Sequence, residues 1–120
     1  MIFVESRLFT KHLPELLGDE GYRELQTLLV GNPDHGPVIP GCDGLRKIRL
    51  GLEAAGKGKR SGARVVYLHI PEVSRCDMLL IYSKDEKDDL TAKEKAILTE
   101  FAHQAKAEAL AWARRKGKEE

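Results

Sequence analysis

Residues 63–83 read ARVVYLHIPEVSRCDMLLIYS, and this stretch decides the fold. It contains two apolar runs, residues 63–70 and residues 78–83, which are rich in β-branched and aromatic side chains and which Pro71 separates. Such runs predict two strands. Because only a short polar turn, residues 72–77, joins them, we expect antiparallel neighbours in one sheet.

A third strand is predicted immediately upstream, at residues 45–50 (LRKIRL), so that the three strands form an antiparallel meander. Its side chains alternate imperfectly, with Lys47 and Arg49 on one side and Arg46 on the other, so that either face could be the basic one. Residues 2–5 (IFVE) predict a further short strand, and the sequence leaves its partner open.

Two helices are predicted between the first strand and the meander. Apolar side chains recur at helical spacing in residues 9–17 and again in residues 22–29. We expect Gly18 to close the first helix and Asp19 to cap the second, which makes the pair a helical hairpin. Residues 31–44 are rich in glycine and proline and predict an irregular connection.

The chain ends in a predicted amphipathic helix. Thr91 and Glu94 have the spacing of a capping box. Asp88 and Asp89 precede it, and we expect them to favour the positive end of the helix dipole. The expected buried face comprises Leu98, Phe101, Ala105, Ala109 and Trp112.

Length and composition indicate one domain over residues 1–120. The chain has 42% hydrophobic and 32% charged residues, as expected of a soluble globular protein. No run approaches the roughly 18 apolar residues of a membrane span, and the opening MIFVESRLF does not resemble a secretion signal. We therefore expect a cytoplasmic protein without a membrane partner.

Positive charge is concentrated in residues 45–67, although the whole chain is nearly neutral, with 20 basic and 19 acidic residues. This stretch predicts a site for a polyanion, and RNA cleavage is one reaction it could support, because arginine stabilises charge on a phosphate. Composition alone favours phosphate binding over catalysis. Glu53 is the only acidic residue in this stretch. The basic residues are Arg46, Lys47, Arg49, Lys57, Lys59, Arg60 and Arg64.

No metal or cofactor is predicted. The four histidines, His12, His35, His69 and His103, lie far apart and have no ligand spacing with either cysteine. Cys42 and Cys76 form no CxxC pair, and a disulfide between them is possible but disfavoured in a reducing compartment.

Three ordered motifs resemble one known family. They are GLRKIR at residues 44–49, GKRSGARVVY at residues 58–67 and IYSKDEKDDLT at residues 81–91. Together with the predicted elements, they resemble the RelE-superfamily toxins of type II toxin-antitoxin systems, especially the HigB-like branch. The resemblance implies an α+β fold in which a helical hairpin and a C-terminal helix pack on a curved, mainly antiparallel sheet of about four strands.

The resemblance also implies an activity. Such toxins are metal-independent endoribonucleases that cut mRNA in the ribosome, and a cognate antitoxin, here expected to be a helix-turn-helix, HigA-like protein, neutralises them. The alternatives from the residues alone are a non-enzymatic RNA- or ribosome-binding module and, less favoured, a co-repressor acting with its antitoxin.

Site residues follow from the matching positions. Arg64 matches the strand arginine that stabilises the scissile phosphate, and we assign Lys84, Lys59 and Arg60 to catalysis with it. Tyr82 could stack on a base, although an aromatic side chain in a strand more often packs in a core. The resemblance leaves the general base open. The expected RNA- or ribosome-binding residues are Arg46, Lys47, Arg49, Lys57 and Tyr82.

Overall fold

A computed structural model describes residues 1–51, 62–87 and 89–119 of the chain. It confirms the predicted α+β class, with three α-helices and one four-stranded sheet. The elements in chain order are β1 (Ile2–Glu5), α1 (Arg7–Leu16), α2 (Gly18–Gly31), β2 (Arg46–Leu50), β3 (Ala63–Ile70), the 3-10 turn η3 (Pro71–Val73), β4 (Arg75–Ser83) and α3 (Ala92–Glu119).

The sheet has the strand order β1-β4-β3-β2. Strands β2, β3 and β4 are antiparallel neighbours, which confirms the predicted meander. Strand β1 pairs with β4 in parallel, in the register Ile2 with Arg75 and Glu5 with Met78. The partner that the sequence left open is therefore β4, and the sheet is mixed.

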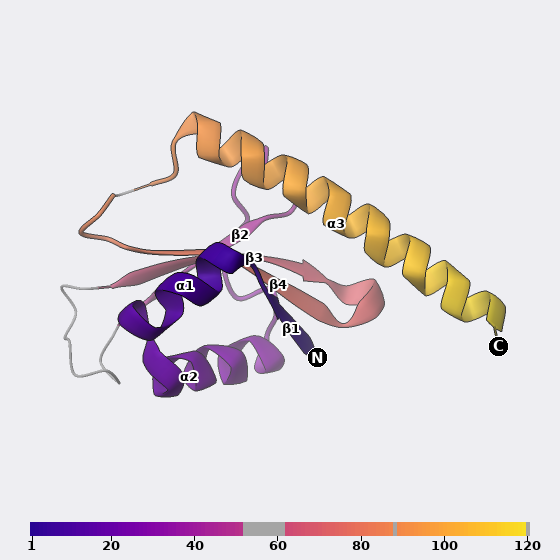
Figure 1. The fold of residues 1–120 in the computed structure, drawn as a ribbon, viewed down its shortest axis with the longest axis horizontal. Coiled ribbons are helices and arrows are strands. Elements are labelled where there is room, and N and C mark those ends of the chain that lie inside the picture. The colour runs from indigo at the N-terminus through magenta and orange to yellow at the C-terminus, as the bar shows by residue number, and fades with distance from the viewer. Residues whose placement is uncertain (52–61, 88, 120) are drawn as a thin grey trace.

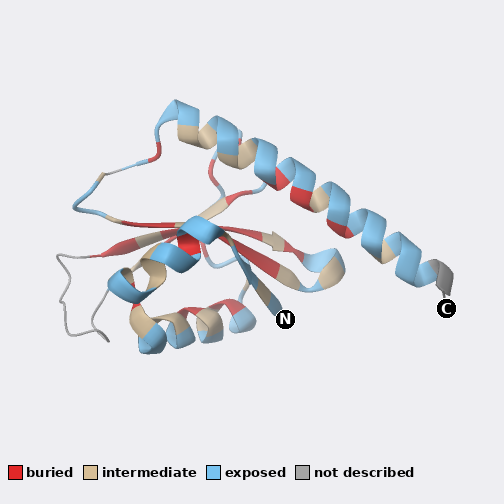
Figure 2. Cartoon of the chain, in the orientation of Figure 1, coloured by how far each residue is buried: buried red, intermediate tan, exposed pale blue. Residues whose placement is uncertain are grey.

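Helices cover both faces of this sheet, with α1 and α2 on one face and α3 on the other (Figure 1). Each face has its own buried core, and Figure 2 shows buried residues along the central strands and on the inner side of α3. Strand β3 contributes to both cores: Val65 and Tyr67 face α1 and α2, while Val66 and Leu68 face α3. Burial on both faces explains why this strand is apolar without alternation.

A β-bulge between β3 and β4 changes which face of the sheet the β4 side chains point to. Val66 pairs with Leu80 but Tyr67 pairs with Met78, so one residue of β4 is extra at this point. Met78 therefore packs in the core beneath α1 and α2, whereas Leu80 and Tyr82 pack on the α3 side. From the sequence, a period of two along residues 78–84 predicts that Met78 shares a face with Leu80, Tyr82 and Lys84. This prediction is wrong for Met78, because the bulge breaks the period.

The turn between β3 and β4 is also shorter than predicted. It consists of η3 and Ser74, which adopts the left-handed conformation with φ 48°, and β4 already begins at Arg75. Arg75 and Asp77 made this segment look like a polar loop. In the strand, the Arg75 Nε donates to Asp77 Oδ1 at 2.7 Å, and this pairing accommodates the buried carboxylate.

The two N-terminal helices follow one another with almost no linker. Leu17 is the C-cap of α1 and the N-cap of α2, and Gly18, with φ +71°, is already the first residue of α2. Asp19 therefore lies in the first turn, where its charge still suits the helix dipole, and the prediction that it is the N-cap was wrong. Asn32 is the C-cap of α2, and Pro33 follows it directly.

Helix α3 begins with the predicted capping box. Thr91 Oγ1 accepts from the Glu94 backbone N–H at 3.1 Å, and Glu94 Oε1 accepts from the Thr91 backbone N–H at 2.9 Å. The predicted buried face was partly wrong, since Phe101 and Trp112 are 47% and 50% exposed. The helix instead buries a stripe of small residues, which lets its backbone approach the sheet and the preceding loop closely: Ala102, Ala105 and Ala109.

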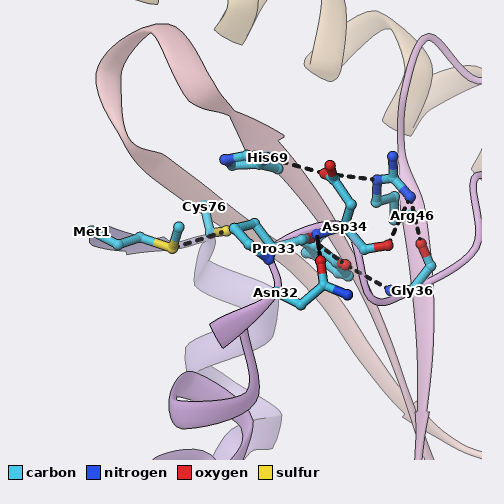
Figure 3. A network of polar contacts seen from close by, with 9 residues as sticks. Met1, Asn32, Pro33, Asp34, Gly36, Arg46, His69 and Cys76 are labelled. Atoms are coloured by element: carbon cyan, nitrogen blue, oxygen red, sulfur yellow. Dashed lines mark hydrogen bonds and ion pairs between the residues drawn. The ribbon is translucent and has the colours of Figure 1, made fainter. Parts of the chain in front are cut away.

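The irregular connection between α2 and β2 is held by a network of polar contacts (Figure 3). The buried Tyr67 hydroxyl donates to the Pro33 carbonyl at 2.7 Å and accepts from the Gly36 N–H at 3.0 Å. Asp34 Oδ1 lies 3.2 Å from His69 Nδ1. A long loop is thereby fixed to β3, so that the start of β2 has a defined position.

Cys42 and Cys76 are both free and buried, as the sequence favoured. Cys42 packs on the α3 side of the sheet and Cys76 on the side of α1 and α2, so the sheet separates the two thiols. Over residues 1–51, 62–87 and 89–119, no helix has the length and apolar character needed to cross a membrane.

Candidate nucleic-acid interface

A row of three side chains crosses the sheet on the face that α3 covers in part. Arg49 of β2 is directly opposite Arg64 of β3, and Arg64 is directly opposite Tyr82 of β4. Ile48 and Val65 point to the other face, which places both arginines on the α3 side. The structure thus resolves the ambiguity of β2: Lys47 and Arg49 share the basic face with Arg64, and Arg46 does not.

The pairing of Arg49 with Arg64 has an energetic consequence. Like charges directly opposite each other on neighbouring strands destabilise a sheet. Within the residues that the structure describes, neither guanidinium has an ion-pair partner. Arg49 is exposed and Arg64 is half-buried. Two arginines on facing strand positions, neither with an ion-pair partner among the described residues, are an arrangement that can bind the oxygens of a phosphate.

Gly62 leaves room for the Arg64 guanidinium. A Cβ atom on Gly62 would lie 3.1 Å from Arg64 Nη1 and 3.3 Å from the Leu50 carbonyl oxygen, so the arginine fork uses space that any other residue would fill. The Gly62 carbonyl accepts from the Lys84 backbone N–H at 3.0 Å. This bond continues the β3–β4 pairing by one step and brings the exposed Lys84 to the same end of the sheet as Arg64.

Tyr82 of β4 lies at this end of the sheet, and it is only 2% exposed. Its hydroxyl is buried and has no hydrogen-bond partner in the described part of the chain, and Lys87 Nζ lies 5.0 Å from the ring centroid. Burial raises the pKa of the Tyr82 hydroxyl, as does the charge of Asp89, while Arg64 opposes the shift. The hydroxyl therefore stays protonated, and its burial favours the packing interpretation over base stacking.

Lys47 lies beside a groove between β2 and the start of α3. Lys47 Nζ is 3.2 Å from Asp89 Oδ1, and Lys95 Nζ of α3 is 3.6 Å from Asp89 Oδ2. The groove has a volume of about 480 Å³. Its lining also includes Arg49, His35 and residues 37–40. A carboxylate and three cations from three parts of the chain thus meet around one concave surface.

Arg46 lies apart from these cations. Its Nη1 donates to the carbonyls of Asp34 at 3.1 Å and Gly36 at 2.8 Å, and its Nε lies 3.6 Å from Asp34 Oδ1. Figure 3 shows this guanidinium turned into the loop before β2. Arg46 is therefore engaged in holding that loop, on the sheet face opposite to Arg49 and Arg64.

Three predicted site residues, Lys57, Lys59 and Arg60, lie outside the described residues. From the predicted set, the structure places Lys47, Arg49 and Arg64 on one face of the sheet and Lys84 at the same end of the sheet as Arg64. It adds Lys95, which the sequence analysis missed. Lys95 belongs to a solvated helix whose alternating charges carry no local signal of a site. Asp89 was assigned to the helix dipole, but its carboxylate also reaches Lys47, 42 residues away.

A metal centre finds no support in the part of the chain that the structure describes. No group of three or more His, Cys, Asp or Glu side chains gathers there in a way that could hold an ion. The chemistry of this surface is that of amino and guanidinium groups.

Comparison with known proteins gives a fold. No protein-family model matches the sequence. Among solved structures, the chain is similar to a mutant of the Escherichia coli toxin RelE in the free state, with a TM-score of 0.51 and 20% sequence identity over 72% of this chain and 86% of that chain. The chain therefore has a RelE-like fold, which confirms the predicted architecture.

Proposed function

We propose that this protein is a toxin of a type II toxin-antitoxin system and an endoribonuclease that cleaves mRNA during translation. The observation that carries the proposal is the pair Arg49 and Arg64 in direct cross-strand register on a RelE-like sheet. Such a pair lowers the stability of the sheet, so packing does not explain it. Binding of a phosphate does, because two arginines together can hold its oxygens. The HigB-like branch and the dependence on the ribosome come from the motif resemblance.

Positive charges without a metal can support RNA cleavage by the neighbouring ribose hydroxyl. The ribose 2′-oxygen attacks the adjacent phosphorus and loses its proton, the bond to the 5′-oxygen breaks, and that oxygen gains a proton. Negative charge grows on the non-bridging oxygens in the transition state, where preorganised Arg64 and Arg49 stabilise it without a metal. Lys84 lies at the same end of the sheet. It transfers a proton, or it stabilises the leaving 5′-oxygen.

The proton acceptor for the 2′-hydroxyl is not Tyr82, because that hydroxyl is buried and its pKa is raised. By the motif resemblance, Lys59 and Arg60 join Arg64 and Lys84 in catalysis. Of these, only a lysine that has lost its proton can accept the proton of the 2′-hydroxyl, because an arginine stays protonated. The motif resemblance gives Lys57 a role in binding RNA or the ribosome. Arg46 acts indirectly, because it holds the loop that precedes β2 in place.

The partners of such a protein are the ribosome with its mRNA and a cognate antitoxin. The antitoxin is expected to be a helix-turn-helix, HigA-like protein encoded next to the toxin. The site of action is the cytoplasm, where translation occurs. Co-purification of a small DNA-binding protein from the native operon checks the antitoxin assignment.

Growth inhibition tests the proposal directly. Wild type, Arg64→Ala and Arg7→Ala are expressed from an inducible promoter, and mRNA ends are mapped on translating ribosomes. Arg7 is an exposed arginine at the start of α1 and serves as the matched control. We expect wild type and Arg7→Ala to arrest growth and create new mRNA ends. Loss of one well-aligned charge stabiliser lowers the rate about 10²- to 10³-fold, so Arg64→Ala should do neither. Equal inhibition by all three refutes the role of Arg64.

A non-enzymatic RNA- or ribosome-binding module is the second candidate. The observation that favours it is the burial of Tyr82, which makes the hydroxyl beside Arg64 inaccessible to a substrate. The two candidates differ in their products. Salt-sensitive binding to ribosomes without new mRNA ends establishes the binding module.

A further inference from the structure

We infer that the groove between β2 and the start of α3 is a second phosphate-binding site for single-stranded RNA, and that Asp89 occupies it in the free protein. The inference deepens the proposed function and rests on RNA being the substrate. The cations of the groove are Lys47 and Lys95. Arg49 also lines it and lies between the groove and Arg64.

Two of the contacts of Asp89 are ones that a phosphodiester could also make. Its two carboxylate oxygens point to two different ammonium groups, Oδ1 to Lys47 at 3.2 Å and Oδ2 to Lys95 at 3.6 Å. The two non-bridging oxygens of a phosphodiester can be shared between two cations in the same way. The cations come from β2 and α3, so the fold, and not one local segment, builds the site.

The exposures of these side chains show which of them can leave. The Lys47 side chain is 17% exposed and lines the groove, whereas the Asp89 side chain is 57% exposed. An ion pair with an exposed partner contributes little to stability. Asp89 can therefore turn into solvent when a phosphate arrives, with loss of these ion pairs and of the hydrogen bond from the Leu90 N–H, while Lys47 stays in place.

The backbone beside Asp89 is anchored independently of this ion pair. Leu90 is buried in the core under α3, and the capping box of Thr91 and Glu94 fixes the chain immediately afterwards. Release of the Asp89 side chain thus needs no unfolding of α3. The Leu90 backbone N–H donates to Asp89 Oδ1 at 2.7 Å, a bond that the amide oxygen of asparagine can also accept.

The position of the groove fits RNA that already contacts Arg64. Lys47 and Arg49 lie two residues apart on the same face of β2, a separation of about 7 Å. A strand that places one phosphate between Arg49 and Arg64 can direct a neighbouring phosphate towards Lys47 and Lys95. Asp89 then competes with the substrate, and the free protein holds part of its binding surface neutralised.

Binding of a short single-stranded RNA with 2′-O-methyl sugars, which cannot be cut, tests the inference by fluorescence anisotropy at low salt. Asp89→Asn removes the competing charge and keeps the acceptor for Leu90, so we expect about two- to five-fold tighter binding. Lys95→Ala should weaken binding and reduce the slope of log affinity against log salt by about 0.7. The matched control is Asp85→Asn, an exposed acid nearby without an ion pair among the described residues.

The results separate this inference from the proposed function. Tighter binding by Asp89→Asn alone supports the site, even if wild type creates no mRNA ends on ribosomes, a result that would remove the cutting activity and leave the groove. An equal gain for Asp85→Asn reduces the effect to net charge and overturns the inference. No change for both Asp89→Asn and Lys95→Ala overturns it as well, and so does the absence of RNA binding by wild type at low salt.

Discussion

Replacing Arg64 with glutamine should stabilise the protein while it abolishes the proposed activity. Arg64 directly faces Arg49 on the neighbouring strand, and neither has an ion-pair partner among the described residues. Glutamine keeps most of the side-chain length and removes one of the two like charges. Cross-strand pairs are worth roughly 0.2–1 kcal/mol, and we expect a gain in the free energy of unfolding of this size.

The gain should appear in thermal unfolding. For 120 residues, an unfolding entropy of about 2.1 cal/mol/K per residue gives roughly 0.25 kcal/mol per degree, so the melting temperature should rise by about 1–4 °C. The measurement is made at about 20 mM and again near 1 M salt. The shift should shrink at high salt, because the screening length falls from more than 10 Å to about 3 Å.

Arg49→Gln and the double variant complete a mutant cycle. If repulsion between the two arginines is the cause, Arg64→Gln should give little gain once Arg49 is already neutral. A melting temperature that falls in Arg64→Gln at low salt, or a gain that persists in the Arg49→Gln background, refutes the reasoning. Retained growth inhibition by Arg64→Gln refutes its functional half.

Three other substitutions test one contact of the site and two contacts of the fold. Gly62→Ala should displace the Arg64 guanidinium, whose Nη1 would lie 3.1 Å from the new Cβ, and lower growth inhibition with the fold retained in circular dichroism. Thr91→Ala removes the acceptor for the Glu94 N–H and should cost about 0.5–2 kcal/mol in urea unfolding; an unchanged midpoint contradicts the cap. Burial raises the pKa of the Asp77 carboxyl, so the native state holds its proton more tightly than the unfolded state, and wild type should lose stability relative to Asp77→Asn as pH rises through the acid range. A stability difference that is flat with pH contradicts that assignment.

Much of the fold could be predicted because the local signals agree with the tertiary structure. The apolar runs on both sides of Pro71 are strands, and the spacing of Thr91 and Glu94 is a working capping box. The predictions failed where a residue's role depends on a distant partner. Asp77 looked like part of a turn because its burial beside Arg75 within a strand has no signature in the neighbouring letters.

The candidate site was predicted as a charge excess, and the sequence could assign Arg64 a role only by resemblance. Periodicity could not choose between the two faces of β2, because Lys47 and Arg49 alternate with Arg46 and either set could face solvent. The packing of Ile48 against α1 and α2 made that choice.

The amino-acid sequence is sufficient for the elements, their order and the concentration of cations between residues 45 and 67, since these depend on side chains that are near neighbours along the chain. The pairing of β1 with β4, the bulge that turns Met78 to the opposite face and the meeting of Lys47, Asp89 and Lys95 follow only from the folded chain. The first and third join residues that lie far apart in sequence, and the second depends on a shift in strand register. Neighbouring residues in the sequence carry no signal of either.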